Sequence, residues 1–315
     1  MADAKGPVDP PRPGREPGTQ VARKNGPVLG VAIDYLDGQI TELLTQDPEV
    51  RTGSPEAVHE MRSATRRLRS ALEIYRSLFD ARATKRLGDE LKWLTRILGR
   101  PRDADVMRER LRAHLRELPE ELKTGLVAGP IEHVLGREYN SGYIQVRESL
   151  ETERYRRLLA DLQNFRDHPP ATDRARRPAL AEGVRFVNNE ARRLEGAHRA
   201  AARTLPGHAR DVALHEVRKG TKRLLHAAES VAGIYPKRAK GLARRAHRLQ
   251  RILGSHQDSV MTRAFLDSLA AGQDLPEESR RAYERIRETE EAIARSAAKK
   301  YAKSRKKDPP LRLRR

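Results

Sequence analysis

The 315-residue sequence contains no cysteine, which excludes disulfide bonds and thiolate metal sites. It has one Trp, four Phe and eight Tyr, so few rings are present on which nucleic-acid bases could stack. The apolar run at 28–33 is far shorter than the roughly 20 residues of a membrane helix. The segment before it has no apolar signal region. These absences predict a cytoplasmic protein without membrane insertion.

Positive charge is what the chain has in excess, with a net charge of +20 and a pI near 10.6. Residues 299–315 contain nine Lys/Arg and one Asp, and residues 1–27 contain five Lys/Arg and three acids. About +10 therefore remains on residues 28–298, so the folded part is itself basic. A field of this sign favours polyanions such as nucleic acid, polyphosphate or an anionic membrane surface.

Proline-rich stretches divide the chain. Residues 1–27 carry six prolines without periodicity and are predicted to be disordered. The segment DHPPATDRARRP, 167–178, is predicted to link a first half, 28–166, to a second half, 179–302. Residues 303–315 are predicted to form a disordered basic tail. Strand signals are absent, so we expect an all-α fold. The expected helices are 28–46, 56–80, 84–98, 103–116, 119–147, 151–166, 179–204, 209–232, 237–253, 258–271 and 276–302.

One basic helix occurs twice. The segments VHEMRSATRRLRSALE at 58–73 and LHEVRKGTKRLLHAAE at 214–229 are identical at 8 of 16 positions. In each copy, residues spaced by three and four form an apolar stripe with the same Thr in third place. Ser54 and Pro55 are start signals for the first copy. The stripes consist of Val58, Met61, Thr65, Leu68, Leu72 and Tyr75, and of Leu214, Val217, Thr221, Leu224, Ala228 and Val231.

A second motif repeats at almost the same offset. LTRILGRPRD at 94–103 matches LQRILGSHQD at 249–258 at 6 of 10 positions. Gly99 and Gly254 are expected to end their helices, and Asp103 and Asp258 to cap the helices that follow. The two offsets, 156 and 155 residues, indicate a tandem duplication. We expect two similar helical bundles related by a pseudo-twofold axis.

A cationic stripe lies beside each apolar stripe, where side chains three and four residues apart share a surface. Either the two cationic stripes are solvated helix faces whose charge is offset by nearby acids, or the two halves bring their cations together to line a groove or pore for a polyanion. The second interpretation is favoured because the stripe borders the core in both halves. Its candidate binding residues are His59, Arg62, Arg66, Arg69, Lys92, Arg96, Arg102, His215, Arg218, Lys219, Lys222, His247 and Arg251. Arg223 and His226 add charge on flanking positions.

Two copies of H-E-x-R-x-x-x-[RK]-R-L, each followed by L-x-R-x-L-G-x-x-x-D, resemble the CHAD family, the conserved histidine α-helical domain. The resemblance covers about residues 28–300. It implies two four-helix bundles with internal twofold symmetry and a basic surface or pore that binds inorganic polyphosphate, and with it association with polyphosphate granules. The family's histidines would map to His59 and His215, and its basic positions to Arg62, Arg66, Arg218 and Lys222. The triphosphate tunnel domain of some members has no counterpart here, which weakens any phosphohydrolase interpretation.

Other functions remain as alternatives. A basic protein associated with nucleic acid would use the core surface and the C-terminal tail, and a phosphohydrolase acting on polyphosphate is a weaker alternative. No H-E-x-x-H or Walker motif is present, so no metal, cofactor or catalytic residue is predicted. A metal bridging His59 and His215, or a phosphoacceptor role for either, has no supporting neighbour. The favoured function is non-enzymatic polyphosphate binding, tighter at pH 6 than at pH 8 if the two histidines take part.

Overall fold

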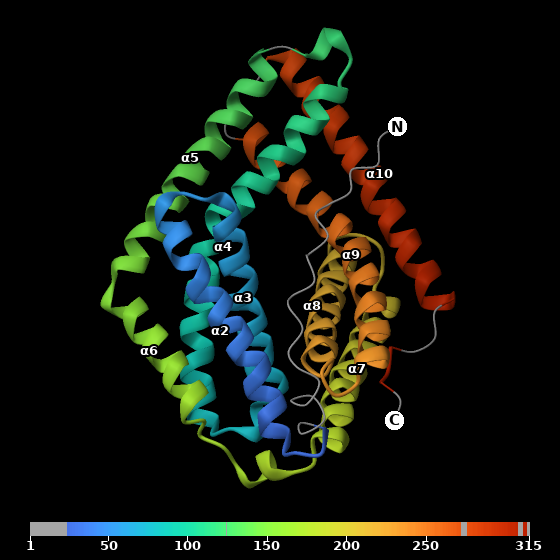
Figure 1. Ribbon diagram of the computed structural model, residues 1–315. Coiled ribbons are helices and arrows are strands. Elements are labelled where there is room, and N and C mark those ends of the chain that lie inside the picture. Colours follow the sequence, from blue (N-terminus) through green and yellow to red (C-terminus); the bar gives the residue numbers. More distant parts are fainter. Residues whose placement is uncertain (1–23, 124, 272–275, 308–310, 314–315) are drawn as a thin grey trace.

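The structure is a computed structural model that describes residues 24–123, 125–271, 276–307 and 311–313. This part of the chain contains nine α-helices and no strand, which confirms the all-α prediction (Figure 1). The α-helices are α2 (Val28–Thr52), α3 (Pro55–Ile74), α4 (Ala81–Glu117), α5 (Gly125–Glu151), α6 (Glu153–Asp167), α7 (Ala179–Arg203), α8 (His208–Ser230), α9 (Pro236–Ala271) and α10 (Glu277–Lys307). Short 3-10 turns occupy Arg76–Leu78, Glu120–Leu122 and Asp173–Arg176.

The start of α3 follows the signals in the sequence. The Ser54 hydroxyl accepts a hydrogen bond from the Ala57 amide at 3.2 Å, and Pro55 occupies the first turn. Just before it, Gly53 ends α2 with φ of 106°, a conformation that favours glycine. The predicted start of this helix is therefore confirmed.

The predicted helix breaks at Gly99 and Gly254 are wrong. Both glycines lie inside long helices, α4 and α9, and neither has a positive φ. A glycine terminates a helix only when it adopts the left-handed conformation, and here the chain continues as α-helix on both sides. Asp103 and Asp258 consequently lie within these helices and are not N-caps.

Helix α4 also continues through Pro101, which removes a backbone donor from its interior. Gly142 of α5 faces this point, and a Cβ at residue 142 would lie only 2.9 Å from the Pro101 nitrogen. The missing side chain therefore allows α5 to approach the proline closely. The long, paired helices α4–α5 and α9–α10 replace the shorter helices expected from the sequence.

The two predicted apolar stripes are buried along their full length, from Val58 to Tyr75 and from Leu214 to Val231. They belong to one continuous hydrophobic core that draws residues from both halves of the chain. A second, smaller core lies where the far ends of α4, α5, α9 and α10 meet, at the top of Figure 1. The halves therefore share their interior. The pseudo-twofold relation between them stays a prediction.

Polar contacts join the halves at both cores. Near the larger core, the hydroxyls of Tyr75 and Ser230 lie 2.7 Å apart and are buried. Near the smaller core, Glu290 of α10 is fully buried and accepts hydrogen bonds from Arg110 of α4, with both Nε and Nη2 at 2.6 Å. His114 Nε2 lies 2.7 Å from the same carboxylate.

The chain ends are more ordered than predicted where the structure describes them. Residues 1–23 lie outside the described residues. Gly26, however, accepts a backbone hydrogen bond from Ala179 at 3.0 Å. At the other end α10 continues to Lys307, five residues beyond its predicted limit. Residues 303–307 thus continue α10, and Leu313 is buried against the core, where the sequence predicts a disordered basic tail.

Candidate functional site

Helices α3 and α8 carry the two copies of the repeated motif and pack against each other. Besides the Tyr75–Ser230 contact, Arg67 of α3 lies 3.8 Å from Glu229 of α8. Each helix turns its apolar stripe toward the core, so the adjoining cationic stripes lie beside the junction of the two helices. The same sequence pattern thus supplies both the core and the site.

Four cations from the two stripes influence one another: Arg62 and Arg66 from α3, and Arg218 and Lys222 from α8. Burial, followed by the charges of Arg62 and Arg218, lowers the pKa of Arg66 to about 10. Burial also lowers the pKa of Lys222 to about 6, with Arg66 and Arg218 as the next causes. The two stripes therefore converge in space.

Two aspartates offset part of this charge. Arg62 Nη2 donates to Asp103 Oδ1 at 2.9 Å. Burial raises the pKa of Asp258, while the neighbouring Arg218 opposes that shift. Asp103 on α4 and Asp258 on α9 end the two copies of the second repeated motif. Each lies beside a cation of the first motif, and this pairing explains the repeat of the second motif better than helix capping does.

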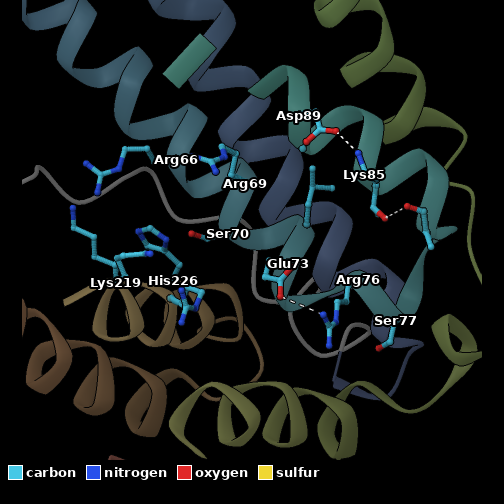
Figure 2. Close-up of a pocket in the computed structure, with 16 residues that line it drawn as sticks. Arg66, Arg69, Ser70, Glu73, Arg76, Ser77, Lys85, Asp89, Lys219 and His226 are labelled. Atoms are coloured by element: carbon cyan, nitrogen blue, oxygen red, sulfur yellow. Dashed lines mark hydrogen bonds and ion pairs between the residues drawn. The ribbon is translucent and has the colours of Figure 1, made fainter. Parts of the chain in front are cut away.

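A cavity of about 780 Å³ opens between α3, the start of α4, and α8 (Figure 2). We name it the α3–α8 cavity. Its wall contains hydroxyls, two acids and seven Lys/Arg side chains, and it has no Phe, Tyr or Trp. The lining residues are Arg66, Arg69, Ser70, Leu72, Glu73, Arg76, Ser77, Ala81, Thr84, Lys85, Gly88, Asp89, Lys219, Lys222, Arg223 and His226.

Both acids of the α3–α8 cavity are engaged by cations. Lys85 Nζ donates to Asp89 Oδ2 at 2.6 Å, and Glu73 Oε1 accepts from Arg193 Nη1 at 3.3 Å. Arg76 also approaches Glu73, as Figure 2 shows. By contrast, Arg66, Arg69 and Lys222 have no ion-pair partner within the described part of the chain. The guanidinium groups of Arg66 and Arg69 therefore present uncompensated positive charge to the cavity.

His226 contributes an uncharged polar group to this wall. Burial lowers its pKa to about 3, and nearby Arg67 and Arg66 add to the shift. Its Nδ1 is buried and has no hydrogen-bond partner among the residues described. A neutral imidazole in this position can donate to or accept from a ligand oxygen.

Four of the predicted site residues line the α3–α8 cavity: Arg66, Arg69, Lys219 and Lys222. Arg62 and Arg218 belong to the same electrostatic cluster without lining the cavity. The sequence prediction omitted Arg76 and Lys85 from the wall. Arg76 lies seven residues after Arg69 and continues its stripe, a signal that was present, whereas Lys85 reaches the wall only because α4 folds back after Asp80.

The two characteristic histidines do not line this cavity. His59 is 44% exposed, and its Nε2 lies 3.9 Å from Glu60. Burial and the charge of Arg102 lower the pKa of His59. Arg102 itself donates to Asp105 at 2.7 Å. His215 Nδ1 lies 2.8 Å from Gln257 Oε1.

The remaining predicted residues lie on α4 and α9. Lys92 and Arg96 are exposed on α4, one and two turns beyond the cavity residue Gly88. His247 and Arg251 line a different cavity, on α9. Of the thirteen predicted residues, four line the α3–α8 cavity, two line this second cavity, and the other seven line neither.

Within the described residues, no three His, Cys, Asp or Glu side chains are grouped as metal ligands would be. None of the described helices combines the length and apolar character that crossing a bilayer requires.

Comparison with known proteins is consistent with this architecture. A family model described as CHAD domain matches residues 34–267. Two relatives from Mycobacterium tuberculosis, the uncharacterized proteins Rv2226 (strain ATCC 25618 / H37Rv) and MT2285 (strain CDC 1551 / Oshkosh), are each 32% identical over 281 residues. The alignment covers 85% of this chain and 53% of each relative. The chain therefore spans about half the length of the curated relatives it matches.

Two solved structures have a similar fold. PptA from Streptomyces chartreusis superposes with a TM-score of 0.76 at 19% identity, covering 89% of this chain and 100% of that one. The CHAD domain from the plant Ricinus communis gives a TM-score of 0.66 at 20% identity, covering 92% and 96%. At these identities the likeness concerns the fold.

Proposed function

The chain belongs to the CHAD domain family, and from this premise we propose that it binds linear inorganic polyphosphate in the α3–α8 cavity without chemical turnover. Polyphosphate binding is a known property of the family. The proposal for this chain concerns which residues hold the polymer and how.

The observation that carries the proposal is the convergence of like charges at the cavity. Arg66 and Lys222 line the cavity from different halves, each partly buried, and the charges of Arg62 and Arg218 act on both. In the free protein this arrangement is unfavourable, because burial and mutual repulsion both oppose the charged forms. A polyanion relieves both costs by supplying opposite charge and hydrogen-bond acceptors. The cavity is therefore suited to a ligand with closely spaced negative charges.

The character of the wall favours a phosphate polymer over single-stranded nucleic acid. Sequence-tolerant binders of single strands stack bases on aromatic rings, each worth about 1–3 kcal/mol. The α3–α8 cavity contains no Phe, Tyr or Trp. Its guanidinium groups, by contrast, match phosphate oxygens with two parallel donors.

The chemistry of the wall favours binding over turnover. Glu73 and Asp89 are both held by cations, and His226 is neutral with a pKa of about 3. A general base must be able to take a proton near the working pH, and Lys222, with its pKa of about 6, is the lining side chain in that condition. Among the described residues, however, Lys222 makes no hydrogen bond to the Ser70 or Ser77 hydroxyl, so neither hydroxyl is activated by it.

Titration of long-chain polyphosphate into the full chain tests the proposal, with calorimetry as the readout. We expect Arg66→Ala/Lys222→Ala to weaken binding by about tenfold or more, since a charge-assisted hydrogen bond contributes roughly 1.5–3 kcal/mol. The matched control is Arg156→Ala/Arg157→Ala on α6, which removes two basic side chains from an exposed surface that lines neither cavity.

Equal weakening by the two double variants would mean that net charge alone determines affinity, and the proposed site would be wrong. Competition by single-stranded or duplex DNA at 150 mM salt tests the ligand class. Displacement of polyphosphate by equimolar DNA phosphate would favour the nucleic-acid alternative.

A further inference from the structure

A second cavity, of about 1050 Å³, lies against α9, and we name it the α9 cavity. Two α8 residues, Leu225 and Glu229, form one edge of it. They lie on the face of α8 next to Lys222 and His226, so α8 separates the two cavities. The lining residues are Leu225, Glu229, Lys237, Arg238, Gly241, Leu242, Ala243, Arg244, Arg245, His247, Arg248, Arg251, Arg312 and Leu313.

The α9 cavity is more positive than the α3–α8 cavity. Its wall has seven Lys/Arg side chains and a single acid, Glu229, against seven and two in the other cavity. That acid is already engaged, since Arg67 lies 3.8 Å from it and Tyr35 donates to it at 3.5 Å. No carboxylate of the described residues pairs with Arg248 or Arg251. Like charges one turn apart on a helix repel, so Arg248 and Arg251 destabilise each other in the free protein.

The C-terminal residues Leu311–Leu313, which we name the strap, complete this wall. The Leu313 amide donates to Asn188 Oδ1 at 2.9 Å, and Asn188 Nδ2 donates to the Leu313 carbonyl at 3.0 Å. Leu313 is only 2% exposed, whereas Arg312 between the two leucines is exposed. The two hydrogen bonds and the buried leucine fix the backbone, so the Arg312 guanidinium is held at the edge of the α9 cavity.

We propose that the α9 cavity is a second binding site for linear polyphosphate and that the strap completes it through Arg312. The ligand class rests on the proposed function, but the site is distinct from the α3–α8 cavity in all its lining residues. No Phe, Tyr or Trp lines it, so base stacking has no platform there either. Closely spaced guanidinium groups on one helix match successive phosphates of one polymer.

A long polymer that occupies both cavities gains avidity, because the second contact becomes intramolecular. A short ligand does not bridge the cavities and reports each site separately. Sodium tripolyphosphate is therefore the probe, titrated calorimetrically into the full chain. We expect two equivalents to bind the unmodified protein, and one equivalent to bind either Arg66→Ala/Lys222→Ala or Arg248→Ala/Arg251→Ala.

The role of the strap is tested in the background that retains only the α9 cavity. Adding Arg312→Ala to Arg66→Ala/Lys222→Ala should weaken tripolyphosphate binding about tenfold or more, as expected for loss of a charge-assisted contact. Asn188→Ala should weaken it similarly by releasing the strap. Tripolyphosphate should slow hydrogen exchange of the Leu313 amide, a readout that simple loss of charge does not produce.

The outcomes separate the two proposals. If the unmodified protein binds one equivalent and Arg66→Ala/Lys222→Ala binds none, the second site is overturned and the α3–α8 cavity remains the binding site. If the unmodified protein binds one equivalent and only Arg248→Ala/Arg251→Ala loses it, the α9 cavity is supported and the placement of the proposed function is overturned. Loss of binding in Arg156→Ala/Arg157→Ala, or displacement by an oligonucleotide of equal charge, overturns both.

Discussion

Acidification from pH 8 to pH 6 should strengthen polyphosphate binding, because Lys222 takes up a proton when the polymer binds. Burial, together with Arg66 and Arg218, holds its pKa near 6 in the free protein. At pH 8 the free amine is therefore mostly neutral, and a bound phosphate chain favours the ammonium form. Asp258, the one acid that acts on Lys222, opposes the lowering of its pKa only weakly.

The size of the effect follows from linkage. If bound phosphate raises the pKa of Lys222 above 8, affinity increases by at most about 50-fold between pH 8 and pH 6, or about 2.3 kcal/mol. The stability of the free protein changes in the opposite direction. The unfolded chain keeps its lysine protonated up to the ordinary pKa of 10.5, so the folded state loses up to about 2.3 kcal/mol on the same acidification.

The assay is calorimetric titration of long-chain polyphosphate at pH 6, 7 and 8, with proton uptake measured in buffers of different ionisation enthalpy. Lys222→Arg is the matched control, because its guanidinium stays charged throughout this range. We expect the variant to bind with nearly equal affinity at all three pH values. An equally steep dependence in Lys222→Arg would assign the titration to another group and refute the reasoning. His226 stays neutral because its pKa is about 3.

Three further predictions concern salt, the buried network and a close helix contact. Binding at the α3–α8 cavity should depend on salt with a log–log slope near −5 if all seven lining cations contact phosphate, at about −0.7 per contact; a slope near zero in a titration from 50 to 300 mM salt would contradict it. Glu290→Gln should lower the free energy of unfolding by up to about 3 kcal/mol, since it leaves the partly buried Arg110 without its paired carboxylate; urea denaturation measures this, and a loss below 1 kcal/mol would argue against it. Gly142→Ala should destabilise the protein by about 1–3 kcal/mol by forcing α5 away from Pro101, whereas Gly136→Ala on the same helix, with open space around it, should be neutral or stabilising in thermal denaturation.

Much of the site could be predicted from the sequence because the same helical period determines which residues of α3 face the core and which basic residues lie beside them. Once the stripe from Val58 to Tyr75 was recognised as apolar, Arg66 and Arg69 had to lie beside it on the same helix. The repeat then identified Lys222 as their counterpart on α8. These three residues line the α3–α8 cavity.

The errors arose where tertiary packing overrides a local signal. Gly99 and Pro101 read as a helix end, yet α5 packs against this segment, and Gly142 accommodates the proline. Arg66 and Arg251 line different cavities, and this too depends on tertiary structure. The spacing of residues along a helix does not say on which side of α8 a residue of α9 will lie. The strap escaped prediction because its order comes from Asn188, 125 residues away in sequence.

The shared core has a consequence for folding. Tyr75 of the first half packs edge-on against Phe186 of the second, with ring centroids 5.1 Å apart, and hydrogen-bonds to Ser230. A half produced alone would expose this surface to water and lose the partners that satisfy it. We therefore expect the two halves to form one cooperative unit that gains and loses its structure in a single transition.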